Sequence, residues 1–368
     1  MKVCCVFNYP PLYRFPIYKE MAEQFDCDFY FGDTVFEPLK KFDVTELKGF
    51  KKYIHAKRTK FKAFVWHSGI ASIFSLKYTH YIVTGDASMI VNWFIIIFAT
   101  IFRKKIYLWC HGEKTYIRKK TTLIMLKAFY RNVTGILMYN HYNCRFMEAL
   151  GINPDRLYVI HNSLDTQLQT KYYSLLSTTD IYKQHFGNDY PTLIYIGRIQ
   201  RVKKTELILE AMHLLQQKGY KLNLVVIGEN VNDTKFGKKL IEYKLEKNIW
   251  MYGPCFDEAK NSELIYNAAV CVSPGNVGLT CIHVLSYGTP VITNGNFAKQ
   301  MPEYEAIIEG KTGDFFKEDN VQQLAEKIEY WTSLSDEQRN ECRKNARKTI
   351  TQEWSVEYQM SLLKRLLN

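Results

Sequence analysis

Two basic side chains follow a predicted buried strand in the second half of the chain, at positions that suit a phosphate ligand. The apolar run TLIYIG (192–197) ends on Gly197, Arg198 comes next, and Lys203 lies five residues further on. An arginine fork binds phosphate through paired hydrogen bonds, and a lysine adds a point charge. These residues predict a site for a diphosphate group. The alternative is a solvated basic loop.

A second stretch, SPGNVGLTCIHVLSYGTPVIT (273–293), places small residues at both ends of a short predicted helix. A strand ends at Ser273 and Pro274, a turn follows, and the helix begins near Leu279 and ends before Gly288. Backbone amides at a helix start attract anions, and small residues let a ligand approach them. The residues expected to line this approach are Gly275, Asn276, Val277, Gly278, Leu279 and Thr280. An ordinary α/β turn is the alternative.

Strand-like and helical segments alternate through both halves, which is typical of parallel α/β domains. The predicted strands are 2–7, 27–32, 80–85, 105–110, 135–139 and 157–162 in the first half, and 192–197, 222–228, 249–253, 269–274 and 291–293 in the second. The polar segment 164–192 is expected to connect two doubly wound domains. Ligands of such folds bind beyond the carboxyl ends of the strands. Here these are the loops after Phe7, Gly85, Cys110, Gly197, Gly228 and Ser273.

Acidic residues follow two strands of the first half. Asp86 comes after the strand that ends at Gly85, and Glu113 follows KIYLWC (105–110) with His111 between them. Either carboxylate could orient an acceptor hydroxyl. A lone histidine at such a place is more often structural than catalytic.

The net charge of +12 is concentrated in the first half of the 368 residues. Nine bases stand against two acids in 40–62, and nine against one in 103–131. Basic patches attract anionic membrane surfaces, nucleic acid or phosphorylated ligands. Because no nucleic-acid module accompanies them, we expect an anionic membrane surface and no nucleic acid. A merely solvated basic face is the alternative.

The uncharged run ASMIVNWFIIIFATIF (87–102) is shorter than the roughly 20 residues that span a bilayer, so a buried crossover helix is expected. Nine cysteines without a C-x-x-C pair indicate reduced thiols. The first residues carry no signal-peptide pattern. These features predict a cytoplasmic protein that is peripheral on the inner face of the cell membrane.

The two motifs of the second half together resemble glycosyltransferase family 4, which has the GT-B fold. Gly197, Arg198 and Lys203 match its G-R-x-x-x-x-K, and SYGTPVI (286–292) matches its A-x-G-x-P-V-I. The resemblance continues in MPEYEAIIEGKTGDFF (301–316). LYVIHNSLD (157–165) is similar to the family's boundary strand, His111 to its strand-end histidine, and the helix after Trp354 to its return to the first domain.

The resemblance implies an α/β fold of two Rossmann-like, doubly wound domains that face each other across a cleft. Residues 1–170, with the helix 354–368, would form the acceptor-binding domain, and 171–353 the nucleotide-sugar-binding domain. It also implies a retaining transfer of a sugar from a nucleotide-diphosphate donor to an acceptor hydroxyl, with His111 contacting the sugar. Arg198, Lys203 and the helix amides would stabilise the departing diphosphate.

The sequence departs from the family at two glutamates spaced eight apart, where it has Gly275 and His283. His283 could hold the ribose through a ring nitrogen, or it could be a buried residue bonded to a backbone carbonyl. Turn amides, Glu303 or Glu305 could replace the donor-sugar contact that Gly275 lacks. In the first loop, NYPPLYRFP (8–16), Arg14 could supply a phosphate contact, or the loop could be purely structural.

We therefore expect a glycosyltransferase whose acceptor is a lipid or a lipid-linked saccharide, as in polysaccharide or glycolipid synthesis. The nucleotide sugar is a substrate, and neither a cofactor nor a metal is expected, because no D-x-D or His-rich pattern follows a strand. Two other classes stay open. One is a non-catalytic nucleotide-sugar-binding partner. The other is a dinucleotide-dependent oxidoreductase, which would need G-x-G-x-x-G after an early strand, where this chain has NYPPLY.

Overall fold

Most strands of both halves are buried on their two faces, which requires helices on both sides of each sheet. In the computed structural model, β1 (Lys2–Phe7) directs Cys4 and Val6 into one apolar cluster and Val3 and Cys5 into another, because successive side chains of a strand point to opposite faces. The structure describes residues 1–33, 40–59, 64–112, 119–230 and 234–368.

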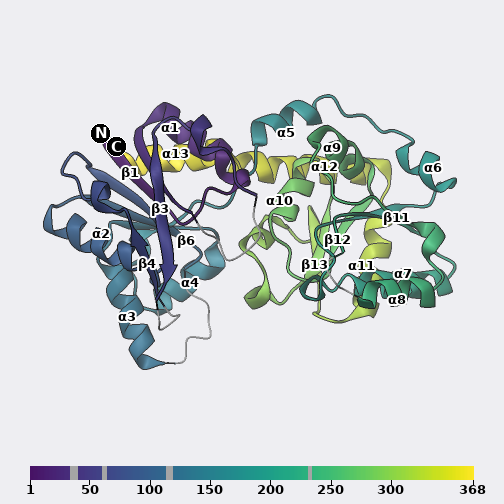
Figure 1. The fold of residues 1–368 in the computed structure, drawn as a ribbon. Helices are drawn as coiled ribbons and strands as arrows, with labels where there is room; N and C mark the ends of the chain where they lie inside the picture. The colour runs from purple at the N-terminus through teal and green to yellow at the C-terminus, as the bar shows by residue number, and fades with distance from the viewer. Residues whose placement is uncertain (34–39, 60–63, 113–118, 231–233) are drawn as a thin grey trace. The chain divides into compact units, whose positions relative to one another are not determined.

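The chain divides into two compact units, and both contain a parallel sheet (Figure 1). Unit 1 comprises Met1–Leu164 and Val356–Asn368, and unit 2 comprises Asp165–Ser355. The elements of unit 1 are β1, α1 (Phe15–Gln24), β2 (Asp26–Gly32), β3 (Phe50–Arg58), β4 (Val65–Ser68), β5 (His80–Thr84), α2 (Ile90–Ile101), β6 (Lys105–Cys110), α3 (Lys120–Arg131), β7 (Gly135–Met138), α4 (His141–Ala149), β8 (Leu157–Val159) and α13 (Val356–Leu367).

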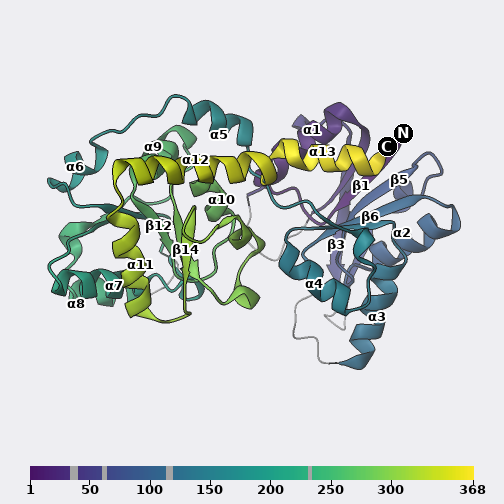
Figure 2. The ribbon, with the colours of Figure 1, turned by 180° about the vertical axis from the view of Figure 1, so that it is seen from behind.

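The eight strands of unit 1 follow the order β4-β3-β2-β1-β5-β6-β7-β8 and are parallel except for the antiparallel pair β3–β4. Helices α2, α3 and α4 cover one face of this sheet through Ile95, Phe129 and Met147. Helices α1 and α13 cover the other, and they lie side by side in Figures 1 and 2. The Gln359 side chain of α13 donates to His161 O at 2.8 Å and accepts from the Ser163 hydroxyl at 2.7 Å.

Unit 2 has a six-stranded parallel sheet with the order β11-β10-β9-β12-β13-β14. This is the Rossmann order, in which the direction of winding reverses between β9 and β12. Its elements are α5 (Thr166–Tyr173), α6 (Ile181–Phe186), β9 (Thr192–Ile196), α7 (Glu206–Gln217), β10 (Asn223–Ile227), α8 (Thr234–Glu242), β11 (Ile249–Met251), α9 (Glu258–Asn267), β12 (Val270–Ser273), α10 (Leu279–Ser286), β13 (Val291–Asn294), β14 (Gly313–Phe316), α11 (Val321–Thr332) and α12 (Asp336–Glu353).

Two regions are more ordered than the sequence pattern predicted. The basic stretch 40–62 contains β3, and the polar segment 164–192 contains α5 and α6. The α/β class with two doubly wound parallel sheets is confirmed. All nine cysteines are free thiols, and eight of them are buried.

Candidate functional site

The first motif lies at the reversal point of the second sheet, where Rossmann folds bind their ligands. β9 ends at Ile196, Gly197 has φ 145°, and Arg198 is exposed beyond it. Gly228, the residue after β10, packs against this loop: a Cβ at 228 would lie 2.0 Å from Gly197 O. Only glycine allows β9 and β10 to end this close together.

The second motif packs directly on the first through backbone atoms. The Gly275 amide donates to Lys203 O at 2.9 Å. A Cβ at position 275 would lie 2.3 Å from Val202 O and 2.6 Å from Lys203 Cα. Position 275 therefore has no room for a glutamate side chain, which gives a steric reason for the departure from the family pattern.

Side chains on and just after β13 hold the carbonyls of the turn that begins at Pro274. The Asn294 amide donates to Pro274 O and Gly275 O, both at 2.8 Å, and the Thr293 hydroxyl donates to Ser273 O at 2.8 Å. The Gln300 side chain accepts from the Val277 amide at 2.8 Å. α10 then begins at Leu279, and its N-cap residue, Gly278, makes no side-chain cap hydrogen bond. Its first amides are therefore available to an anion.

Lys203 joins the two motifs through its side chain as well. Its ammonium donates to Asn276 O at 2.7 Å. Burial and the neighbouring charge of Arg198 together lower the pKa of Lys203 to about 8, although Glu303 opposes the shift. Glu303, on the short 3-10 helix Pro302–Ala306, is buried, whereas Glu305 is half-buried. A partly buried lysine beside an arginine favours a bound anion, which would stabilise both charges.

Two residues of α10 complete the predicted donor set. The Thr280 hydroxyl donates to Ile196 O at 3.1 Å, and so the face of α10 that carries Thr280 lies against the end of β9. His283, one turn further along, pairs through Nε2 with Glu258 Oε1 at 2.9 Å. Its partner is therefore a carboxylate and not a backbone carbonyl, and its predicted contact with ribose stays a prediction.

The structure thus gathers the eleven predicted donor-site residues at the carboxyl ends of β9, β10 and β12: Gly197, Arg198, Lys203, Gly228, Gly275, Asn276, Val277, Gly278, Leu279, Thr280 and His283. Glu258, Asn294 and Gln300 were missed, because they lie outside the motif. The polar pair Thr293-Asn294 at the end of an apolar strand is a signal that could have indicated two of the residues that hold the turn.

In unit 1, Arg14 and His111 meet around one aromatic ring. The Arg14 guanidinium lies 5.1 Å from the centre of the Tyr139 ring and 5.0 Å from that of Trp109. The His111 ring lies 4.5 Å from that of Tyr139. Among the described residues, no acidic side chain pairs with Arg14, whose polar contact is a 3.5 Å bond to the Tyr18 hydroxyl. An anionic group would satisfy this guanidinium, and its phosphate contact stays a prediction.

The two predicted acceptor carboxylates have different outcomes. Asp86 is exposed at the end of β5, and its Oδ1 accepts from the Ser88 amide at 2.8 Å, which is a local turn contact. Glu113 lies outside the described residues.

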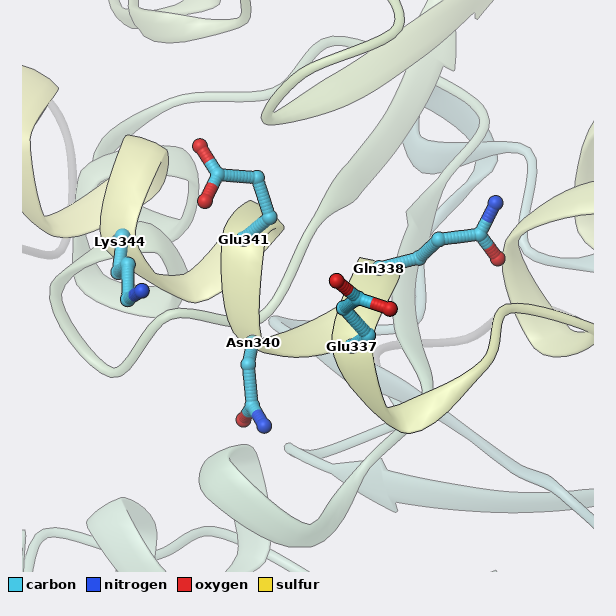
Figure 3. A pocket seen from close by; sticks show the side chains of 5 residues that line it. All are labelled: Glu337, Gln338, Asn340, Glu341 and Lys344. Carbon is cyan, nitrogen blue, oxygen red and sulfur yellow. The ribbon is translucent and has the colours of Figure 1, made fainter.

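A surface hollow elsewhere in unit 2 has no site chemistry. Its lining comes from α12 alone, and Figure 3 shows the side chains of Glu341 and Asn340 pointing to different sides of that helix.

Within the described ranges, no group of three or more His, Cys, Asp or Glu side chains is placed to hold a metal ion. The expectation of a metal-independent reaction stays a prediction.

A family comparison matches unit 2. Residues 177–349 match the model described as glycosyl transferases group 1. No curated protein matches the chain.

Solved structures resemble the whole chain. A glycosyltransferase from Rickettsia africae ESF-5 has a TM-score of 0.74 at 16% identity, with 100% of this chain and 99% of that chain covered. Anabaena Alr3699/HepE in complex with UDP has a TM-score of 0.74 at 12% identity, with the same coverage. The apo lipopolysaccharide outer core galactosyltransferase WaaB has a TM-score of 0.67 at 14% identity, again with coverage of 100% and 99%. The predicted GT-B fold is confirmed.

The backbone contact at Gly275 leads to a stability prediction. We expect Gly275→Ala to lower the free energy of unfolding of unit 2 by about 1–3 kcal/mol, because the new methyl group collides with the backbone of 202–203. Gly278→Ala in the same turn is the control, since its Cβ would meet only Met301 side-chain atoms at 3.7 Å. Denaturant unfolding of both variants is the measurement. Equal stability of the two would contradict the steric argument.

The lowered pKa of Lys203 leads to a pH prediction. Free Lys203 loses its proton near pH 8, and a bound diphosphate favours the charged form, so binding above that pH requires proton uptake. We expect the affinity for UDP, measured by titration calorimetry, to fall by up to about tenfold per pH unit above pH 8. Without ligand, the lowered pKa makes the contribution of Lys203 to folding stability rise with pH between about 8 and 10.5.

The matched variant is Lys203→Arg, which stays charged throughout this range. The affinity of this variant for UDP should not change between about pH 7 and 10, the range over which Lys203 loses its proton but an arginine does not. A pH-independent affinity in the unmodified protein would show that Lys203 does not contact the ligand.

Proposed function

We propose that the chain transfers a sugar from a nucleoside-diphosphate donor to an acceptor hydroxyl, with retention at the anomeric carbon. The observation that carries this proposal is the junction of the two motifs, where the Gly275 amide bonds to Lys203 O and the Lys203 ammonium bonds to Asn276 O. At this junction a partly buried cation, Lys203, an exposed cation, Arg198, and the start of α10 lie at the sheet's reversal point.

This arrangement suits the departure of a diphosphate. As the glycosidic bond to the donor breaks, negative charge grows on the leaving oxygen. Arg198 and Lys203 supply positive charge there, and the amides at the start of α10 supply fixed dipoles. His111, with its ring against Tyr139 in unit 1, is proposed to contact the sugar.

The comparisons support a nucleotide-sugar donor. HepE was solved with UDP and with UDP-glucose, and WaaB is described as a galactosyltransferase. A family 4 assignment and the retaining outcome rest on the motif resemblance. A non-catalytic nucleotide-sugar-binding protein is the second candidate, because Gly275 cannot provide the donor-sugar contact of the family glutamate.

Turnover of variants tests the diphosphate assignment. We expect Arg198→Ala and Lys203→Ala each to reduce donor turnover by about tenfold or more, since a hydrogen bond to a charged group is worth about 1.5–3 kcal/mol. Donor hydrolysis without acceptor can be measured before the acceptor is known. Lys204→Asn is the control, because Lys204 instead pairs with Glu318 and Asp319 at 2.9 and 2.6 Å.

The outcomes separate the two candidates. Unchanged turnover in both variants would remove Arg198 and Lys203 from the reaction. Nucleotide binding without hydrolysis or transfer, for any of a panel of nucleotide sugars, would favour the non-catalytic binding protein.

We further propose a lipid or lipid-linked acceptor and an anionic membrane surface as the place of reaction. α2 exposes Phe94, Ile97 and Ile101 along one face at 44%, 53% and 66%, although the sequence suggested a buried helix. Five residues of α2 are buried, including Ile95 and Ile96. The helix is therefore half-buried, with an apolar stripe left exposed, and no described helix is long and apolar enough to cross a membrane.

The neighbouring helix α3 carries exposed basic residues. α3 contacts α2 through Phe129 and Trp93, whose ring centres are 5.0 Å apart. The other side of α3 exposes Lys120, Lys127 and Arg131. Some other bases have partners within the protein: Lys51 pairs with Asp28 at 3.2 Å, for example. An exposed apolar stripe on one helix and exposed bases on the next are suited to an interface with anionic lipid.

Vesicle flotation tests the membrane proposal. We expect the protein to bind vesicles that contain anionic lipid, and this binding to weaken with salt, because each base near the surface contributes about 1 kcal/mol. Lys120→Glu with Lys127→Glu should reduce binding. The control, Lys218→Glu with Lys247→Glu, makes the same charge change at exposed positions of unit 2. Equal flotation of the two variants, or equally poor binding to neutral and anionic vesicles, would contradict the proposal.

A further inference from the structure

A carboxylate outside the two motifs is held rigidly beside the candidate donor site. Glu258, the first residue of α9, accepts on Oε1 from His283 Nε2 at 2.9 Å and from the Tyr287 hydroxyl at 2.6 Å. His283 lies on α10, and Tyr287 is the residue that directly follows this helix. The Glu258 side chain is 23% exposed and that of His283 15%, so the group is close to the surface but not free to rotate.

The way α10 packs on the sheet shows where Glu258 and His283 lie relative to the reversal point. Thr280 and His283 are three residues apart and share a face of the helix. Since Thr280 bonds to the last residue of β9, the same face passes over the start of the Arg198 loop. His283 lies four residues after Leu279, about 6 Å along the axis from the helix start. That is the next region a ligand would reach after its phosphates.

The charge of Glu258 indicates which part of a ligand fits there. Burial raises the pKa of the Glu258 carboxyl, but hydrogen bonds from His283, Tyr287 and Gln169 outweigh it, and the net pKa lies below the ordinary value. An ionised carboxylate repels phosphate and accepts hydrogen bonds from hydroxyl groups. The cationic end of the site therefore suits a diphosphate, and this end suits a neutral, hydroxyl-bearing group.

We propose that Glu258 binds the vicinal hydroxyl groups of the nucleotide-sugar donor, and that His283 and Tyr287 position its carboxylate. The proposal rests on the proposed function, because it needs a donor whose diphosphate lies at the start of α10. It assigns the carboxylate to α9, 25 residues before His283 in the chain. Vicinal hydroxyls occur on the ribose and on the sugar, and the test separates these two sources.

The test is calorimetric titration of the full chain with UDP, GDP and ADP, followed by the 2′-deoxy analogue of the one that binds most tightly. We expect Glu258→Gln to weaken the ribonucleotide by about tenfold or more, since a hydrogen bond to a charged group is lost. The deoxy analogue should bind the unmodified protein more weakly and should lose less on mutation. Glu263→Gln is the control: this glutamate lies on the same helix and pairs with Lys260 at 2.8 Å.

A rescue experiment shows whether Glu258 binds the ligand or only joins two helices through its pair with His283. The double variant Glu258→Gln, His283→Glu supplies a carboxylate from α10 and should recover most of the lost affinity. If Glu258 only joins two helices, the double variant should bind no better than the single one. Melting curves without ligand show whether each variant is folded. His283→Gln is a milder second variant, because glutamine keeps a neutral hydrogen-bond donor. We expect it to lower the affinity for the ribonucleotide by a few-fold.

Each outcome has a distinct meaning. If Glu258→Gln weakens UDP-glucose but not UDP, the hydroxyls belong to the sugar. If it weakens the ribonucleotide and its deoxy analogue equally, or weakens neither a nucleoside diphosphate nor UDP-glucose, the inference is wrong while the proposed function stands. If no nucleoside diphosphate binds the unmodified protein, the proposed function fails, and the inference fails with it.

Discussion

The candidate site depends on one backbone contact, the approach of Gly275 to the Val202–Lys203 peptide. The 2.9 Å hydrogen bond from the Gly275 amide to Lys203 O fixes the end of β12 against the loop after β9. The steric limit is as important as the bond, because a Cβ would lie 2.3 Å from Val202 O. Two loops that are about 70 residues apart in sequence thereby form one surface at the point where a Rossmann sheet binds its ligand.

The same contact accounts for the electrostatics of the site. With the loops in place, the Lys203 ammonium bonds to Asn276 O and is partly buried beside Arg198, which lowers its pKa. The carbonyls of the turn before α10 are held by hydrogen bonds from Thr293 and Asn294. Positive charge and amide dipoles are in place before a ligand arrives, which reduces the reorganisation that binding requires.

Much of this could be predicted from the sequence, because the strands buried on both faces are continuous apolar runs and the turn residues mark their ends. β1, for example, has the predicted bounds 2–7. Strand β3 was not predicted, since its lysines obscure the alternation of a half-buried strand. The pairing of Glu258 with His283 could not be predicted either, because it depends on how α9 and α10 pack and not on local pattern.

The central claim is that a nucleoside diphosphate contacts the joined loops. Hydrogen exchange of the full chain, read by mass spectrometry with and without saturating UDP, tests it most directly, because exchange reports protection of individual backbone segments. The account predicts slower exchange in peptides that cover residues 276–281 and 198–204, the loops joined by the Gly275–Lys203 bond. Saturating UDP that leaves both segments unprotected, or protects only other parts of the chain, would contradict it.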